Sequence, residues 1–125
     1  MSEPIYRRLG QLEWEKLRDI RPEDRAFAEQ GIAAGARRSW LTTGELGFHS
    51  ALNEMPAGFE VPPHSHDSSE LFVVLAGNCT VVDGTQLSAG DVAAIPAGMK
   101  YGFRVGDDGL RFVVIRSEDA HTTLA

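Results

Sequence analysis

The sequence predicts an all-β fold, a single antiparallel β-barrel or jelly roll that follows an N-terminal arm. Short apolar runs recur from Arg37 onward, and most of the 13 glycines and 6 prolines lie between these runs. Runs of this kind, closed by turn residues and without a long helix between them, are typical of antiparallel sandwiches and barrels. The length of 125 residues fits one domain. We therefore expect an arm over residues 1–36 and a barrel domain over residues 37–125.

The arm is charged and lacks a regular alternation of apolar residues. Pro22 suits the first turn of a helix, and the acidic residues that follow it favour a helix N-terminus. These features predict a short helix near Glu23–Gln30, ended by Gly31. We expect the arm to cover the barrel or a partner subunit.

The barrel segment divides into eight or nine short strands by its period of two and its turn residues. Leu46, Phe48 and Leu52 are predicted to share one face of a strand that runs to Met55. A turn is expected over Gly106–Gly109, where glycine and aspartate interrupt two apolar runs. Later strands are expected over residues 70–76, 79–82, 86–88, 92–95, 101–105 and 110–115.

The charge balance argues against a polyanionic partner. The chain has 12 basic and 18 acidic residues and a net charge of -6, and residues 41–125 hold four basic against eleven acidic side chains. A surface that follows phosphates needs the opposite balance. We expect no nucleic-acid binding and no binding to an anionic membrane.

The single cysteine and the apolar runs predict where the protein resides. Cys79 cannot form a disulfide within the chain, which suits a reducing compartment. The first residues lack the apolar core of a signal peptide, and no run approaches 18 apolar residues. We expect a cytoplasmic protein that does not span a membrane.

Two of the four histidines form a candidate metal site. His64 and His66 are two residues apart, so on a strand both imidazoles point to the same face. Glu70 opens the next predicted strand and can approach the same point. Two imidazoles and one carboxylate suit a divalent ion such as iron, manganese, zinc or nickel, with open positions for water or substrate. The alternative is a solvated pair of histidines at a strand edge.

The spacing around these residues resembles the first motif of the cupin family. The chain matches that motif at every fixed position, in the order Gly58, five residues, His64-x-His66, three residues, Glu70, six residues and Gly77. The resemblance implies a small single-domain cupin, of the RmlC-like kind, with a metal site inside its barrel. It also implies a homodimer, to which the arm would contribute.

The second cupin motif is only partly matched. Gly90, Pro96 and Gly98 have the spacing of that motif, but Tyr101 stands where the family has its fourth ligand, a histidine, and Val105 stands where it has asparagine. Tyr101 could coordinate the ion as a phenolate, contact a bound water or substrate, or fill space as a wall residue. We favour contact with water or substrate over direct ligation.

Several other residues are candidates for the pocket. His49 is predicted to share a face with Ala51 and Asn53, and if this face lines the cavity His49 could move a proton or stand in for the missing fourth ligand. The alternative is a histidine on the surface or one that is satisfied by its neighbours. Met55 and Met99 lie beside turns near the two motifs and could line the pocket mouth. The remaining residues are expected to have no functional role: Cys79 is predicted in the core, His121 in an exposed tail, and Arg104 and Arg111 on the surface.

These observations predict a metal-dependent cupin enzyme that acts on a small polar metabolite. His64, His66 and Glu70 would hold the ion, while Tyr101 and His49 would orient the substrate or move protons. The resemblance does not choose among dioxygenase, isomerase and lyase chemistry. The alternative is a cupin that binds or senses a small molecule without transforming it, which the missing fourth histidine favours.

Overall fold

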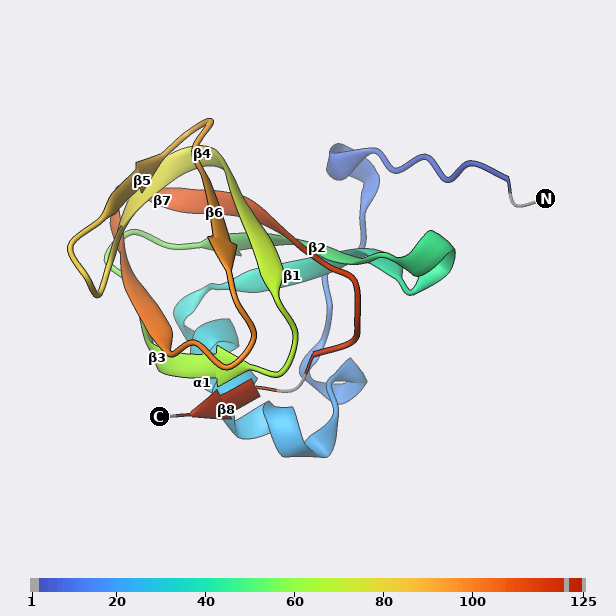
Figure 1. Cartoon of the computed structure of the whole chain (residues 1–125), viewed down its shortest axis with the longest axis horizontal. Coiled ribbons are helices and arrows are strands. Elements are labelled where there is room, and N and C mark those ends of the chain that lie inside the picture. Colours follow the sequence, from blue (N-terminus) through green and yellow to red (C-terminus); the bar gives the residue numbers. More distant parts are fainter. Residues whose placement is uncertain (1–2, 121, 125) are drawn as a thin grey trace.

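The structure is a computed structural model that describes residues 3–120 and 122–124. It consists of one helix, eight strands that pair antiparallel, and four short 3-10 turns, which confirms the predicted all-β fold (Figure 1). The helix is α1, Arg25–Ala34, and the strands are β1 Arg37–Thr43, β2 His49–Met55, β3 Glu60–His66, β4 Glu70–Val81, β5 Gln86–Ser88, β6 Val92–Ile95, β7 Tyr101–Arg116 and β8 Thr122–Leu124. The 3-10 turns are Leu9–Gln11, Leu17–Asp19, Pro22–Asp24 and Glu45–Gly47.

Strand β7 organises the jelly roll because it pairs with three other strands. In its first half Phe103 lies opposite Val61 of β3 and Val81 of β4. In its second half Val113 lies opposite Leu52 of β2 and Val73 of β4. One long strand therefore places the first motif, on β3 and β4, around a common interior.

The core fills one part of that interior with aromatic and β-branched side chains. Phe72 stacks on Phe112 with ring centroids 4.2 Å apart, and Phe103 meets the same pair edge-on. Cys79 is buried in this cluster, as predicted, and burial raises the pKa of its thiol. A buried thiol with a raised pKa is a packing residue, not a nucleophile.

The predicted turn over Gly106–Gly109 is wrong, because these residues lie within β7 and do not separate two strands. The pairing with β4 instead shifts register between Gly77 and Cys79, where β7 carries extra residues. Gly77 has φ of 79°, and a Cβ on it would lie 1.9 Å from the carbonyl oxygen of Gly109. The last glycine of the first motif is therefore needed for the close approach of two backbones.

The predicted helix exists, but its end lies four residues further on. Helix α1 runs through Gly31 to Ala34 and is capped by Gly35, whose φ of 104° stops the helix in the left-handed conformation. Gly31 stays helical and packs near Phe59. Within the described residues no helix is long and apolar enough to cross a membrane.

The N-terminal arm packs against this chain's own barrel. Ser39 of β1 donates a hydrogen bond to the carbonyl of Glu13, and the Glu15 carboxylate accepts hydrogen bonds from Arg38 and Trp40. Helix α1 lies beside β3 and β8 at one end of the barrel (Figure 1). The first strand begins at Arg37, while the division into arm and domain at that residue stays a prediction.

The strand predicted through Leu46 and Phe48 is wrong at its beginning. A 3-10 turn occupies Glu45–Gly47, Leu46 has φ of 58°, and both Leu46 and Phe48 are exposed. Strand β2 begins only at His49, and Leu52 is the member of the predicted face that is fully buried. The prediction failed because exposed loops also carry apolar residues, so the apolar residues of this loop continued the alternation of the strand in the sequence.

Candidate functional site

A cavity of about 480 Å³ opens inside the jelly roll, next to the residues of the two motifs. Its lining mixes apolar side chains with polar and charged ones, and the part next to the histidines of the first motif is called the polar end. The polar end includes His64, His66, Tyr101 and Arg116. The apolar walls include Phe27, Met55, Phe59, Val61, Phe72, Phe103, Phe112 and Val114.

The arm closes part of the cavity mouth. Phe27 of α1 packs its ring 5.4 Å from that of His64, measured between centroids. Arg21 donates a hydrogen bond to Asp119 at 2.9 Å and another to the carbonyl of Ala120 at 2.8 Å. The segment before α1 is thereby tied to the segment before β8, and both line the cavity.

The two imidazoles of the first motif converge at the polar end, as their spacing predicts. Their ring centroids are 4.8 Å apart and the rings are nearly perpendicular. His64 Nδ1 lies 2.8 Å from the carbonyl oxygen of Pro62, which can only accept, so Nδ1 carries the proton. His66 Nδ1 lies 3.1 Å from the hydroxyl of Thr122. In both rings Nδ1 is engaged, which leaves Nε2 for a ligand or a metal ion.

Both imidazoles are held in the neutral form. Burial lowers the pKa of His64, an effect that the Pro62 carbonyl and the Glu70 charge only partly oppose. Burial, and then the positive charge of Arg116, lower the pKa of His66 to about 3. A neutral imidazole is the form that binds a metal ion.

This depressed pKa predicts that acid destabilises the metal-free protein. His66 takes up a proton near pH 6.5 when unfolded but only near pH 3 when folded, so stability is present above 6.5 and is lost as the pH falls. The slope for this one group is about 1.4 kcal/mol per pH unit. Urea unfolding in the presence of a chelator, between pH 7 and pH 5, measures this slope. The His66→Asn variant is expected to show a smaller change in the free energy of unfolding with pH. Equal slopes for the two proteins would contradict the assignment.

Glu70 adjoins the polar end through Tyr101 and Arg116, although it is not one of the residues that line the cavity. The Tyr101 hydroxyl donates a short hydrogen bond to Glu70 Oε1, and both side chains are buried. Burial, and then the adjacent Glu70 charge, raise the pKa of Tyr101 far above its ordinary value. Tyr101 is therefore a neutral phenol that donates a hydrogen bond. Its ring lies 4.6 Å from that of His64 and 6.0 Å from that of His66.

Arg116 is a residue of the site that the sequence analysis missed. Its Nη2 lies 2.7 Å from Glu70 Oε2, and the two side chains are 13% and 1% exposed. Phe112 and Val114 point inward on β7, so alternation places Arg116 on the same face. The same alternation in the sequence indicates an inward side chain at position 116, but the predicted strand ends at residue 115 and so excludes Arg116.

Glu70 is thus engaged by Tyr101 and Arg116, not by the imidazoles. As the described side chains stand, no three His, Cys, Asp or Glu residues lie close enough together to hold a metal ion. His64 and His66 already have a suitable arrangement, whereas Glu70 has to exchange a partner in order to join them.

Backbone contacts fix the first motif against the second. The amide of Gly98 donates to the carbonyl of His66 at 2.8 Å, and the amide of Ala97 donates to the hydroxyl of Ser69 at 3.0 Å. The Pro-x-Gly turn of the second motif therefore holds the loop between His66 and Glu70. This contact explains why the two spacings occur together although the ligand position of the second motif is changed.

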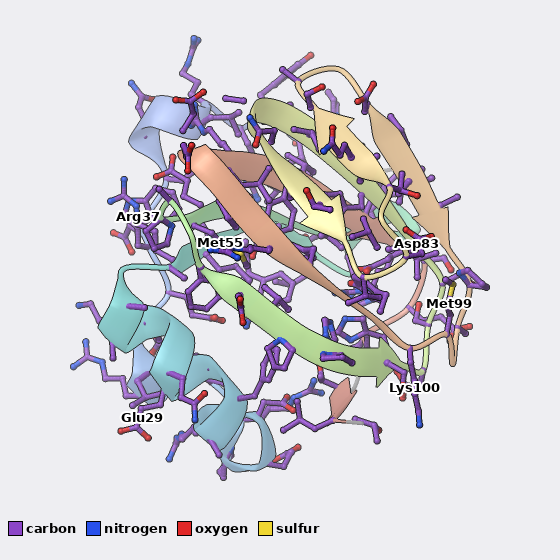
Figure 2. All side chains as sticks on the ribbon, turned by 90° about the vertical axis from the view of Figure 1, so that its left-hand side faces the viewer. Glu29, Arg37, Met55, Asp83, Met99 and Lys100 are labelled. Atoms are coloured by element: carbon purple, nitrogen blue, oxygen red, sulfur yellow. The ribbon has the colours of Figure 1, made fainter. Side chains whose placement is uncertain are left out.

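The structure places the other candidates as follows. His49 lines the cavity with Ala51 and Asn53, and its Cα lies opposite Arg116 across the β2–β7 pairing. Met55 lines the cavity, whereas Met99 is 46% exposed and lies at the far end of the molecule from Arg37 and Glu29 (Figure 2). The prediction for His121 lies outside the described residues.

Arg104 and Arg111, which the sequence analysis expects on the surface, are not among the residues that line the cavity. Arg104 is exposed, and Arg111 pairs with Glu54 at 3.2 Å. The inward arginine of β7 is therefore Arg116 and neither of these two.

Comparison with known proteins agrees with this arrangement. The family model of the cupin domain matches residues 51–116, which hold both motifs and more than half of the chain. This chain belongs to the cupin family. No protein of curated function matches its sequence.

Solved structures share the cupin fold. An RmlC-like cupin from Shewanella frigidimarina is similar over 92% of this chain and 90% of its own, with a TM-score of 0.66 and 23% identity. The DMSP lyase DddQ from Ruegeria pomeroyi is similar over 62% of this chain and 43% of its own, with a TM-score of 0.58 and 26% identity. An oxalate decarboxylase variant from Bacillus subtilis is similar over 66% of this chain and 25% of its own, with a TM-score of 0.58 and 19% identity.

The last two comparisons are partial. This cupin spans less than half the length of the lyase and a quarter of the length of the decarboxylase. Similarity at this level of identity concerns the fold, and the neighbours named here differ in chemistry.

Proposed function

We propose that this cupin is a metal-dependent enzyme that acts on a small metabolite inside the cavity. His64, His66 and Glu70 are the proposed ligands, and the ion is iron, manganese, zinc or nickel. One observation carries the proposal: two neutral imidazoles, each with Nδ1 already engaged, lie side by side on the wall of one cavity. Nε2 of each ring is left for a ligand, and the neutral imidazole is the form that binds a metal ion.

The donor set fits a divalent ion. Two imidazoles that share an ion, each with Nε2 about 2.1 Å from it, would place their ring centroids roughly 4.5–5 Å apart. The centroids of His64 and His66 are 4.8 Å apart. Glu70 Oε2 is buried and accepts no hydrogen bond from the described residues, so it has a lone pair available for a cation.

The ion would supply Lewis-acid polarisation of an oxygen atom of the metabolite. The chain's own residues would then bind the metabolite and orient it. Tyr101 is a neutral phenol, so it offers a hydrogen-bond donor and not a base. Its proposed role is therefore to orient the metabolite. His49, on the cavity wall, is the group proposed to move a proton. The apolar walls suit the carbon skeleton of the metabolite, whose polar group would face the histidines.

A second candidate function is binding or sensing without chemistry. The observation that favours it is the engagement of Glu70 by Arg116 and Tyr101, which leaves only two ligands in place. The cavity would then take a small molecule without a metal ion. Turnover of a substrate, once one is found, separates the two functions.

Elemental analysis of the purified, untagged protein tests the metal site. We expect near-stoichiometric metal in the wild type and its loss in His64→Ala, because that variant removes one of the two ligands already in place. Circular dichroism of both proteins controls for folding. Iron would direct the substrate screen toward dioxygen chemistry, and zinc, nickel or manganese toward isomerases and lyases. Absence of metal after reconstitution with each ion would refute the proposal in favour of the binding protein.

We further propose a cytoplasmic homodimer without nucleic-acid or membrane partners. An outward face of β4 and β6 supports the dimer, because Leu71 and Val92 are 43% and 55% exposed there. The net charge of -6 argues against polyanions, and the lone buried Cys79 suits a reducing compartment. Light scattering is expected to give twice the chain mass of 13.6 kDa. The mass of a single chain at micromolar concentration would contradict the dimer.

A further inference from the structure

Arg116 occupies a central position among the charged groups of the cavity. On the β2–β7–β4 pairing its Cα lies between those of His49 and Glu70, so the three side chains share the inner face. It lines the same cavity as His64 and His66. It therefore adjoins the candidate ligands from the side of Glu70.

The contact between Arg116 and Glu70 is an ion pair without hydrogen-bond geometry. Nη2 and Oε2 are 2.7 Å apart, yet neither Oε2 nor the Nε of Arg116 has a hydrogen-bond partner among the described residues. Arginine and carboxylate bind each other most strongly through two parallel hydrogen bonds. This pair lacks them, so the attraction between the charges holds it together and a stronger cation can replace it.

The other arginines of the cavity wall have partners of their own. Arg37 donates two hydrogen bonds to Glu54, and Arg38 donates two to Glu15. Arg21 binds Asp119. These carboxylates are already engaged, so Glu70 is the carboxylate that neutralises Arg116.

We propose that Arg116 is a resident counter-cation of Glu70, which a divalent ion displaces when it binds His64 and His66. The proposal rests on the metal site proposed above. Glu70 has one oxygen on Tyr101 and the other beside Arg116, so the ion can gain this ligand only by taking it from one of them. A guanidinium and a divalent ion near one carboxylate also repel each other. Arg116 therefore weakens metal binding, while it keeps Glu70 neutralised in the metal-free protein.

A Co²⁺ titration of the full chain tests this competition. Arg116→Gln removes the charge but keeps a donor for Glu70, and we expect it to bind Co²⁺ roughly tenfold more tightly than the wild type. Arg116→Lys keeps a cation and is expected to stay close to the wild type. Arg111→Gln is the matched control, because it removes an arginine paired to Glu54 on the same strand. It is expected to leave the affinity unchanged.

Suppose that the wild type binds Co²⁺ and that His64→Ala abolishes this binding. If Arg116→Gln then binds Co²⁺ no more tightly than the wild type, the counter-cation proposal is overturned and the metal site is retained. Binding by neither the wild type nor Arg116→Gln overturns both proposals. Binding by Arg116→Gln alone would mean that the ion cannot displace Arg116 in the native protein, which overturns the proposed displacement together with the native metal site.

A variant that fails to fold without metal still decides the question. In that case Co²⁺ is expected to refold Arg116→Gln, because the ion replaces the missing cation, with circular dichroism as the readout. The double variant Glu70→Gln/Arg116→Gln has no carboxylate for the ion and is expected to lose the gain in affinity. Failure of Co²⁺ to refold the single variant, or equal gains in the single and double variants, overturns the proposal.

Discussion

Replacing Arg116 with methionine is expected to lower the free energy of unfolding of the metal-free protein by about 3–5 kcal/mol. The methionine fills most of the space but leaves the Glu70 carboxylate, 1% exposed, without a cation. A buried charge without its partner costs far more than the intact pair contributes. Urea unfolding in the presence of a chelator, followed by tryptophan fluorescence, measures the loss.

The double variant Glu70→Gln/Arg116→Met is the control for this prediction. It removes both charges, so most of the lost stability is expected to return, and Tyr101 keeps an acceptor in the glutamine amide. A loss of less than about 1 kcal/mol in the single variant would mean that solvent screens Glu70 as it screens surface pairs. An equal loss in both variants would assign the effect to packing of the arginine stem.

The candidate site could be predicted from sequence where it depends on local spacing. His64 and His66 share a face because strand side chains alternate, and the structure brings their rings together. The cavity position of His49 follows from the same alternation with Ala51 and Asn53. These residues are fixed by one strand each, so neighbours in sequence are enough to place them.

Arg116 shows why the rest of the site was missed. Its role depends on pairing with β4, which brings it beside Glu70, 46 positions earlier in the chain. Alternation from Phe112 and Val114 places its side chain inward, but it does not say which carboxylate it meets. Long-range register is set by the whole sheet, not by the local pattern.

The boundary errors have a similar origin. Gly31 and Gly35 are both plausible helix ends in sequence, and the left-handed conformation at Gly35 decides between them. The glycines at 106 and 109 look like a turn, yet both lie within one strand, where Gly106 leaves room for the Asn78 side chain and the carbonyl of Gly109 approaches Gly77. Glycine marks special backbone geometry, but only the fold shows which kind.

Tyr101→His is expected to tighten divalent-metal binding by about tenfold or more, or roughly 1.4 kcal/mol. Position 101 lies directly opposite His64 on the β3–β7 pairing, with the tyrosine ring 4.6 Å from that imidazole. A histidine there adds a nitrogen ligand and also removes the phenol that holds Glu70 Oε1. Both changes favour a complete four-ligand set. Competition titration against a metal-binding dye, on chelator-treated protein, gives the affinities.

Tyr101→Phe separates the two contributions to that increase. It frees the carboxylate without adding a ligand, so the difference between the histidine and phenylalanine variants measures the new nitrogen donor. Phenylalanine also leaves buried Glu70 with one hydrogen bond fewer, which is expected to cost about 1–3 kcal/mol of stability without metal. Unchanged or weaker binding by a folded Tyr101→His variant would mean that position 101 does not face the ion. The phenol would then belong to the substrate side of the cavity, where its donated hydrogen bond orients a ligand instead of shaping the metal site.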